Sequence, residues 1–554
     1  MADVAHEPRV EFDTTPYDWK HWRLSIDGGV ATLAMDVQED KGFRPGYELK
    51  LNSYDVGVDI ELYDAVTRLR FEQPQVRAVV VTSAKDRVFC AGANIKMLAG
   101  SSHPFKVNFC KYTNETRCSI EDASAHSDMT FVCAVGGACA GGGYELALAC
   151  EEIYLIDDGS SAVSLPEVPL LGVLPGTGGL TRLVDKRRIR RDIADVFCTK
   201  AEGFKARDAK KYRFVDQTWP RSKWNDGVAG RVAEIVAGHG GPGTETGIEL
   251  TKLVPEITDG DFAWEHVTLS FDQDERTATL TMTGPATAPP ASHDELHALG
   301  DGSWALKAFR ELEAAVHELR FNHQDIGLVL LHTRGDAEQV MAWDAAIQSL
   351  RDGGSWLARE IQLYQKRMLG KVDNMAKSLF AVIDENSCFA GVLFELALAS
   401  DRSFMFLDED LENGVWVGPA SFGAFPMITG MTRLEARFYG EPEQIGAVQE
   451  RQGERIDPEE AEELGLVTAS PDDIDWEDEL RIAIEERISL SPDGLTGMEQ
   501  NLRFVGQETC ESRIYGRLSA WQNWIFQRPN AVGPQGALTL YGAPERPVFD
   551  FRRV

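Results

Sequence analysis

The chain has 554 residues and a formal net charge of −32, with 43% hydrophobic and 26% charged residues. This charge argues against nucleic acid as a bulk partner, because phosphate binding needs clustered Lys and Arg. No run approaches the roughly 18 apolar residues of a membrane span, and no signal peptide is recognisable. Nine cysteines without a CxxC pair argue against a disulfide framework or a metal site. We therefore expect a cytoplasmic globular protein of two to four domains.

The first part of the chain alternates between strand and helix patterns. Apolar β-branched runs at 30–36 and 78–83 predict strands, and the segment 56–71 between them has the period of an amphipathic helix. A further apolar run at 131–140 predicts another strand. Strands that alternate with helices of this length predict a sheet joined by crossover connections, hence an α/β fold.

Two glycine-containing turns each follow a predicted strand and open a predicted helix. The first is Ala91-Gly92-Ala93-Asn94 and the second is the triple glycine 141–143. The first N–H groups of a helix have no partner within it, and the helix dipole places positive charge there. Glycine lets the backbone approach a ligand closely. Two such turns could hold one oxygen atom between two N–H donors, which is an oxyanion hole.

Two carboxylates accompany these turns. Glu145 lies three residues after Gly142 in an apolar helix, and Glu167 follows Pro166 in a loop. Paired carboxylates can divide the activation of water and the protonation of a leaving group. The residues alone leave a structural explanation open, because a triple glycine is commonly a turn and such a Glu is commonly a surface residue.

The succession "FCAGANIK", "AGGGYELALAC" and "PEVPLLGVLPGTGGLTRL" resembles the crotonase (enoyl-CoA hydratase/isomerase) superfamily over most of residues 20–220. The resemblance implies a spiral of ββα turns and acyl-CoA thioester substrates. It implies that Ala93 and Gly142 supply the oxyanion-hole N–H donors and that Glu145 and Glu167 are the catalytic carboxylates. It implies no cofactor beyond the CoA of the substrate itself.

Further positions are candidates for binding the substrate. The polar segment 105–129 lies between the two oxyanion turns, where the family covers the acyl pocket. The candidates within it are Asn108, Cys110, Tyr112 and Asn114. Lys96, just past the first turn, is a candidate for a CoA phosphate, and Gly172 in the loop after Glu167 completes the set. Each of these residues also has an ordinary structural explanation.

The second half of the chain repeats the first. "YDWKHWRLSIDGGVATLAM" is answered by "FAWEHVTLSFDQDERTATLTM", and "GGGYELALACEEIYLI" by "GVLFELALASDRSFMF". Trp19 matches Trp264 at an offset of 245, and Glu145 matches Glu395 at an offset of 250. A unit of about 250 residues is too long for a solenoid repeat and predicts a duplicated domain.

The second copy lacks the glycine turns. It has "EQVMAWD" in place of the first turn and Val392 and Leu393 in place of two glycines, although Glu395 remains. We interpret this copy as degenerate and structural. The Gly-rich segment 237–247 is typical of a flexible connection between copies. The predicted domains are an active crotonase-like copy at 1–258, a degenerate crotonase-like copy at 259–475, and a helical C-terminal extension and tail at 476–554.

The resemblance, with the second copy and the extension included, implies a carbon–carbon lyase acting on an aromatic acyl-CoA. Two alternatives stay open. An enoyl-CoA hydratase or isomerase would use the same four positions, and an acyl-CoA-binding scaffold would have two inert copies. We also expect a homodimer, because the fused copy could occupy one contact surface of the usual family trimer. The C-terminal aromatic residues Trp521, Trp524 and Phe526 could cover another.

Overall fold

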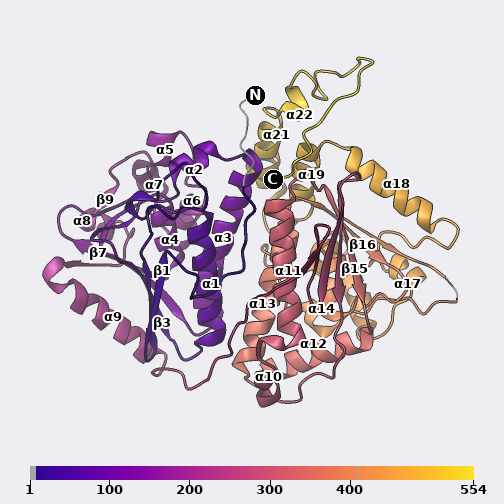
Figure 1. The fold of residues 1–554 in the computed structure, drawn as a ribbon, viewed down its shortest axis with the longest axis horizontal. Coiled ribbons are helices and arrows are strands. Elements are labelled where there is room, and N and C mark those ends of the chain that lie inside the picture. The colour runs from indigo at the N-terminus through magenta and orange to yellow at the C-terminus, as the bar shows by residue number, and fades with distance from the viewer. Residues whose placement is uncertain (1–7, 409) are drawn as a thin grey trace. The chain divides into compact units, whose positions relative to one another are not determined.

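The structure is a computed structural model that describes residues 8–408 and 410–554 (Figure 1). The chain divides into two compact units, Met1–Lys252 and Leu253–Val554. The predicted division after residue 258 lies close to this boundary. The second unit holds both 259–475 and 476–554, and their separation into two domains stays a prediction. Within the described residues, no helix combines the length and the apolar character that crossing a membrane requires.

The first unit is built on a six-stranded sheet with the order β1-β2-β3-β5-β7-β10. Its strands are β1 (Trp22–Asp27), β2 (Val30–Met35), β3 (Ala78–Ser83), β5 (Thr130–Val135), β7 (Glu152–Asp157) and β10 (Gln217–Pro220). β1 and β2 form an antiparallel hairpin, and the other neighbours are parallel. The hairpin turn contains Gly28, whose φ of +54° costs glycine little.

A second, four-stranded sheet has the order β4-β6-β8-β9. Its strands are β4 (Arg87–Cys90), β6 (Gly137–Ala140), β8 (Ala162–Ser164) and β9 (Phe204–Lys205). Three times the chain runs from a strand of the large sheet through a strand of this small sheet into a helix, as β3-β4-α2, β5-β6-α4 and β7-β8-α5. Because β4, β6 and β8 are parallel, the three helices begin at the same edge. This alternation is the α/β pattern that the sequence predicts for the first unit.

Nine α-helices accompany these strands within the described part of the first unit. They are α1 (Val56–Glu72), α2 (Ile95–Gly100), α3 (His103–His126), α4 (Gly142–Ala149), α5 (Glu167–Leu171), α6 (Gly179–Thr181), α7 (Arg191–Cys198), α8 (Ala206–Lys211) and α9 (Trp224–Gly238). α1 agrees with the predicted helix 56–71. It begins after Asp55, whose carboxylate accepts hydrogen bonds from Gly57 N and Val58 N. α1 and α3 lie side by side (Figure 1).

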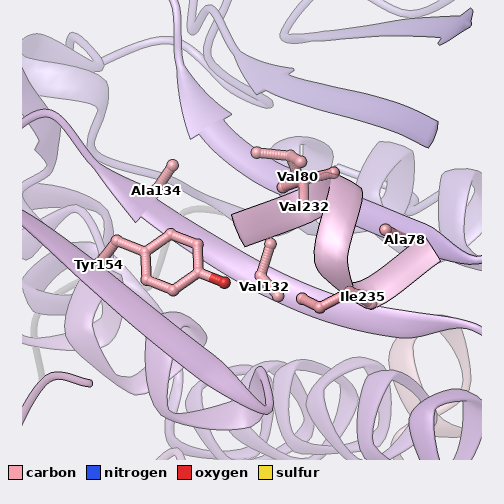
Figure 2. Close-up of a cluster of buried hydrophobic side chains, with 7 residues drawn as sticks. All are labelled: Ala78, Val80, Val132, Ala134, Tyr154, Val232 and Ile235. Carbon is pink, nitrogen blue, oxygen red and sulfur yellow. The ribbon is translucent and has the colours of Figure 1, made fainter. Parts of the chain in front are cut away.

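One face of the large sheet is covered by α9. Figure 2 shows a cluster of buried apolar side chains that joins three neighbouring strands, β3, β5 and β7, to this helix. Its members are Ala78, Val80, Val132, Ala134, Tyr154, Val232 and Ile235. Burial of such side chains stabilises the fold by about 25 cal/mol per Å² of apolar surface removed from water. The packing holds the parallel strands β3, β5 and β7, which lead into the small-sheet strands β4, β6 and β8.

The second unit has one seven-stranded sheet, in the order β11-β12-β13-β14-β15-β16-β17. Its strands are β11 (Glu256–Thr258), β12 (Asp261–Ala263), β13 (Val267–Asp272), β14 (Thr277–Thr283), β15 (Leu328–Arg334), β16 (Ser378–Ile383) and β17 (Arg402–Met405). Neighbouring strands from β11 to β14 are antiparallel, and neighbouring strands from β14 to β17 are parallel. Where the first unit has its small sheet, the described residues here form isolated bridges, such as Ala390 with Trp416.

The helices of the second unit fall into two groups. Those before residue 476 are α10 (His293–Leu299), α11 (Trp304–His317), α12 (Ala337–Asp352), α13 (Trp356–Asp373), α14 (Gly391–Leu398), α15 (Arg433–Arg437), α16 (Glu443–Glu450) and α17 (Pro458–Glu463). Those after it are α18 (Trp476–Ser489), α19 (Pro492–Leu502), α20 (Cys510–Arg513), α21 (Ser519–Ile525) and α22 (Pro529–Val532). A π-helical turn, Ile514–Leu518, joins α20 to α21.

The C-terminal extension packs on the sheet of the second unit. Ala483 of α18 lies in a buried cluster with Leu328, Phe380 and Phe404, which come from β15, β16 and β17. Arg503 also donates to Asp401 and to main-chain carbonyls that precede β16. The extension therefore contributes to the core of this unit, in the way that α9 contributes to the core of the first.

Candidate active site

The two glycine turns of the first unit touch each other at the edge of the small sheet. Gly92 follows β4 with a φ of +89°, and Gly141 follows β6 with a φ of +55°. A methyl group built on Gly92 would lie 2.9 Å from Gly142 N and 3.1 Å from Ala140 O. Glycine at position 92 is therefore required for the two turns to approach this closely.

Ala93 and Gly142 each present a backbone N–H that donates no hydrogen bond within the described part of the chain. Ala93 pairs with Tyr54 in a parallel bridge, in which Tyr54 N donates to Gly92 O and Asn94 N donates to Tyr54 O. This pattern uses the groups on either side of Ala93, so the N–H of Ala93 itself points away from Tyr54. Gly142 opens α4, and the first N–H groups of a helix have no acceptor within it.

Glu145 is held by three donors. It lies in the first turn of α4 and is buried. Its Oε1 accepts hydrogen bonds from Thr177 N at 2.9 Å and Gly179 N at 2.8 Å, and its Oε2 accepts one from the Thr177 hydroxyl. The loop before α6 therefore wraps around the carboxylate and fixes its orientation. Glycine at position 179 suits this contact, because a methyl group there would lie 2.9 Å from Glu145 Oε1.

Glu167 has a buried oxygen without a partner. It is the first residue of α5, and its Oε1 would lie 2.8 Å from a methyl group built on Gly141. Its Oε2 accepts no hydrogen bond from any described residue. Burial raises the pKa of the Glu167 carboxyl to about 7, and the charge of Glu145 adds to this effect. A group with this pKa exchanges protons readily near neutral pH, as a general acid or base must.

The candidates on α3 serve the local structure in ways that the sequence did not indicate. Asn108 donates to Pro104 O within the helix, at 3.1 Å. The Tyr112 ring packs against Phe12 and Tyr63, with centroids 5.2 and 5.6 Å apart. Asn114 donates to Gly176 O at 3.2 Å, directly before Thr177. Of these three, Asn114 is tied to the loop that surrounds Glu145. The role of all three in substrate binding stays a prediction.

Cys110, Lys96 and Gly172 differ in their surroundings. Cys110 is partly buried on α3, and burial raises the pKa of its thiol to about 11, with the charge of Glu145 contributing. Lys96 is exposed on α2, just after the first glycine turn. Gly172 ends α5 in the left-handed conformation, with a φ of +63°. Gly172 thus terminates the helix that carries Glu167.

Several residues that complete the site were missed by the sequence analysis. Thr177 and Gly179 lie in the quoted motif "PGTGG", but their contact with Glu145 depends on a loop that returns to α4. Tyr54 and Arg117 lie beneath the oxyanion turns, and both are buried. A buried Tyr before a helix and a buried Arg within one carry no sequence signal of their own. Only the contacts between these elements identify them.

In the second unit, the residue that matches Gly142 in the sequence is Val392, and its N–H already has an acceptor. Val392 N donates to Asp344 Oδ2 at 2.5 Å, and the Asp344 carboxyl is buried on α12. Burial raises the pKa of Asp344 to about 8, and the charge of Glu395 adds to this effect. Glu395 Oε2 accepts a hydrogen bond from Arg433 Nη1 at 3.0 Å, and Arg433 also binds Asp373.

The second unit has a cavity of its own. A cavity of about 410 Å³ lies in the second unit, lined by residues of its C-terminal part that include Arg513, Arg517 and Trp521. None of its lining residues belongs to the first unit. Among the described residues, no group of three or more His, Cys, Asp or Glu side chains is placed to hold a metal ion.

Known proteins resemble this chain either over its first unit alone or over its full length. The enoyl-CoA hydratase/isomerase family model matches residues 48–239, which hold both glycine turns and both glutamates. Benzoyl-CoA-dihydrodiol lyase of Aromatoleum evansii is 51% identical over 557 residues, covering 100% of each chain. A fatty acid oxidation complex subunit alpha of Shewanella loihica is 33% identical over 198 residues, covering 36% of this chain and 26% of that one.

Solved structures match over a shorter length. A crystal structure of an enoyl-CoA hydratase from Bacillus anthracis is 24% identical with a TM-score of 0.33, covering 39% of this chain and 77% of that chain. The match to the lyase of Aromatoleum evansii covers both units.

Proposed function

This chain belongs to the benzoyl-CoA-dihydrodiol lyase family of the crotonase (enoyl-CoA hydratase/isomerase) superfamily, and we propose that it is a ring-cleaving carbon–carbon lyase. Its proposed substrate is 2,3-epoxybenzoyl-CoA. One epoxide and two water molecules would give 3,4-didehydroadipyl-CoA semialdehyde and formate. The observation that carries the proposal is the 51% identity over the full length of a lyase of that name.

The oxyanion hole is the part of the site that suits a thioester. The N–H groups of Ala93 and Gly142 are free in the described structure and lie on two touching turns. When the bond between the thioester-bearing ring carbon and its neighbour breaks, the electron pair remains on that ring carbon and delocalises onto the thioester oxygen. Two N–H donors stabilise that negative charge, and removal of one such donor typically costs about 3 kcal/mol.

The two glutamates divide the remaining work according to their surroundings. Glu167 has a free carboxyl oxygen and a raised pKa, so it takes the proton from water as the general base and returns it to the product. Glu145 is engaged by three donors, so it orients the reacting water and the nearby loop. Both roles are assigned from the surroundings of the two carboxylates. The sequence alone does not distinguish them.

We also propose that the second unit is a degenerate copy of the first. Strands β13 to β17 repeat the order of β1, β2, β3, β5 and β7, with one antiparallel hairpin followed by parallel neighbours. Gly141 and Gly391 lie 250 positions apart and both have positive φ, +55° and +47°. The motif that carries Glu145 is thus repeated in conformation as well as in sequence.

A buried glutamate on the first long helix supports the same relationship. Glu61 on α1 accepts hydrogen bonds from the main-chain N–H groups of Lys20, His21 and Trp22 at the start of β1. Glu311 on α11 accepts one from His266 N at 2.6 Å, at the start of β13. The offset of 250 between the two glutamates equals the offset between Glu145 and Glu395.

Three further expectations belong to the proposal. We propose that the protein works as a homodimer and needs no cofactor beyond the CoA of its substrate. The cytoplasmic location expected from the sequence stays a prediction. Sedimentation equilibrium tests the dimer, and a monomer at all concentrations would contradict it. Activity that survives dialysis against a chelator tests the independence from metal.

The experiment that tests the function is incubation with epoxidised benzoyl-CoA, followed by assays of formate and aldehyde. We expect one formate for each epoxide consumed, and formate release at least 100-fold slower with the Glu167→Gln variant. Hydration of crotonyl-CoA without formate release from the epoxide would favour an enoyl-CoA hydratase. Binding of the epoxide without turnover of either compound would favour an acyl-CoA-binding scaffold.

A further inference from the structure

Tyr54 contacts both halves of the proposed oxyanion hole. Its main chain brackets Ala93, since Tyr54 N donates to Gly92 O at 3.0 Å and Tyr54 O accepts from Asn94 N at 2.8 Å. These two bonds fix the peptide planes on both sides of Ala93. The N–H of Ala93 is thereby turned away from Tyr54, in the direction that leaves it free to bind an oxygen.

The side chain of Tyr54 reaches the other donor. A methyl group built on Gly142 would lie 2.0 Å from Tyr54 Oη, so the hydroxyl occupies the place that a side chain at position 142 would need. The phenol ring also packs against Phe109, with centroids 6.1 Å apart. Burial raises the pKa of Tyr54 well above its usual value, so this hydroxyl stays neutral.

Arg117 connects the Tyr54 hydroxyl to the backbone of Gly142. Arg117 Nη2 donates to Tyr54 Oη at 3.1 Å and to Gly142 O at 3.0 Å. Its Nη1 donates to Thr113 O at 3.1 Å and lies 4.0 Å from Asp59 Oδ1. All of these groups are buried, and hydrogen bonds to a charged group in such surroundings are strong.

We propose that Tyr54 is a positioning residue that sets the separation and direction of the Ala93 and Gly142 N–H donors, with Arg117 as its partner. Oxyanion donors act only when they lie about 2.7–3.1 Å from the developing charge, so their mutual placement must be held closely. Tyr54 holds one donor through its main chain and the other through its hydroxyl. The inference deepens the proposed function and rests on it, because both concern the same thioester oxygen.

The test removes the hydroxyl and measures polarisation of the thioester directly. Tyr54→Phe keeps the ring and the main-chain bridge but removes the contact with Arg117. Benzoyl-CoA carrying ¹³C at the thioester carbonyl lacks the epoxide, so its C=O stretch can be recorded by infrared difference spectroscopy while it is bound. In the wild-type protein we expect this stretch to lie below its frequency in water. In Tyr54→Phe we expect at least half of that shift to be lost.

Kinetics provide a second readout on the epoxide substrate. We expect kcat of Tyr54→Phe to fall roughly 10- to 100-fold, the range for misplacement of a reacting group, and KM to change less than about 3-fold. Arg117→Lys keeps the charge but cannot hold Tyr54 Oη and Gly142 O in the same geometry, so it should reproduce the spectral change. If Tyr54→Phe fails to fold, Arg117→Lys still tests the positioning role.

Tyr154→Phe is the matched control. Tyr154 is buried in the same unit and belongs to the cluster of Figure 2. Its hydroxyl donates to Glu152 Oε2 at 2.9 Å. This control should keep the full carbonyl shift. A full shift in both Tyr54→Phe and Arg117→Lys would overturn the positioning role and leave the proposed function standing. An unshifted carbonyl in the wild-type protein would overturn the oxyanion hole itself, and the positioning role with it.

Discussion

Gly142 in the first unit and Val392 in the second occupy corresponding places after a glycine with positive φ, but their N–H groups meet different surroundings. The N–H of Gly142 is free within the described residues. The N–H of Val392 donates to the Asp344 carboxylate at 2.5 Å. A methyl group on the preceding Gly391 would lie 2.0 Å from the same Asp344 oxygen. In the second unit, an oxygen of the chain itself therefore occupies the position where a thioester oxygen would bind in the first.

In the second unit, a specific side chain of the chain itself occupies the backbone donor that corresponds to Gly142 N. From the sequence we expected Val392 and Leu393 to obstruct the approach of a ligand. The structure adds that the backbone donor is still present and is satisfied internally by Asp344. A buried N–H without an acceptor is costly, so a copy that no longer binds substrate gains from an internal one. In the proposed degenerate copy, a side chain of the chain itself thus takes the place of a ligand.

The matching glutamates of the two units, Glu145 and Glu395, also differ in their surroundings. Glu145 accepts hydrogen bonds from two backbone N–H groups and a hydroxyl, all in a loop beside Glu167. Glu395 is paired with Arg433, which also binds Asp373, and all three are buried. A carboxylate in a buried ion pair is held as part of the core. The proposed asymmetry between an active and a structural copy can be tested from both sides.

Gly142→Val should have the largest effect, because it gives the first unit the residue of the second. Its side chain would collide with Tyr54 Oη, since even a methyl group would lie 2.0 Å away. We expect turnover of the epoxide to fall by more than about 1,000-fold, through displacement of one oxyanion donor. Gly230→Val is the control, because a methyl group at that exposed position on α9 meets nothing within 4 Å. Turnover near the normal rate in the folded Gly142→Val protein would refute the assignment of this donor.

Glu145→Gln and Glu167→Gln should each reduce turnover at least 100-fold, the first by misplacing the reacting water and the second by loss of general acid–base catalysis. Glu167→Gln removes the group that exchanges protons with water. Glu145→Gln replaces a carboxylate oxygen by an amide that would face donors of the Thr177 loop. Steady-state formate release measures both, with circular dichroism to confirm folding. If both variants turn over normally, the acid–base assignment is wrong.

The pH dependence of kcat/KM should report the raised pKa of Glu167. A general base must be deprotonated, and its deprotonated fraction increases steeply with pH below its pKa of about 7 and approaches one above it. We therefore expect kcat/KM to rise about tenfold per pH unit below pH 7 and to level off above it. The residual activity of Glu167→Gln should lack this step. A profile that falls through the same range would assign Glu167 as the general acid.

Asp344→Asn should change the pH dependence of stability. In the folded protein the pKa of Asp344 is about 8, above its ordinary value, so the folded state binds a proton that the unfolded state has released. Stability contributed by this group is present at low pH and falls as pH rises toward 8, by at most about 1.4 kcal/mol per unit. We expect Tm of Asp344→Asn, relative to wild type, to increase from pH 5 to 8. A constant difference across that range would contradict this assignment.

Glu395→Gln should have the smallest effect on turnover. Its carboxylate faces Arg433 in the core of the second unit, without free oxyanion donors beside it. We expect formate release within a few-fold of the wild-type rate, together with lower stability, because Arg433 would lose a buried partner. A large loss of turnover in the folded variant would show that the second unit takes part in catalysis.

The sequence by itself determined the features that depend on local pattern. The predicted strands 30–36 and 78–83 and the helix 56–71 appear as β2, β3 and α1, since residues that are close in sequence determine hydrophobic period and helix capping. The predicted strand 131–140 is wrong as a single element, because the chain passes from β5 of the large sheet to β6 of the small sheet within it. The glycine turns and Glu145 were identified for the same reason, because a turn that needs glycine is recognisable without its surroundings. The proposed duplication was likewise inferred from the sequence, since a repeat is a property of the sequence alone.

Only the tertiary structure decided what these local features meet. Tyr54 and Ala93 are 39 positions apart, and Glu145 and Thr177 are 32 apart. Their contacts depend on how the small sheet brings separate helix starts to one edge. The same holds for Asp344, whose neighbour Val392 lies 48 positions further on. Hydrogen-bond satisfaction and burial are sums over such distant neighbours, and for that reason the sequence identified two glutamates while the fold distinguished their surroundings.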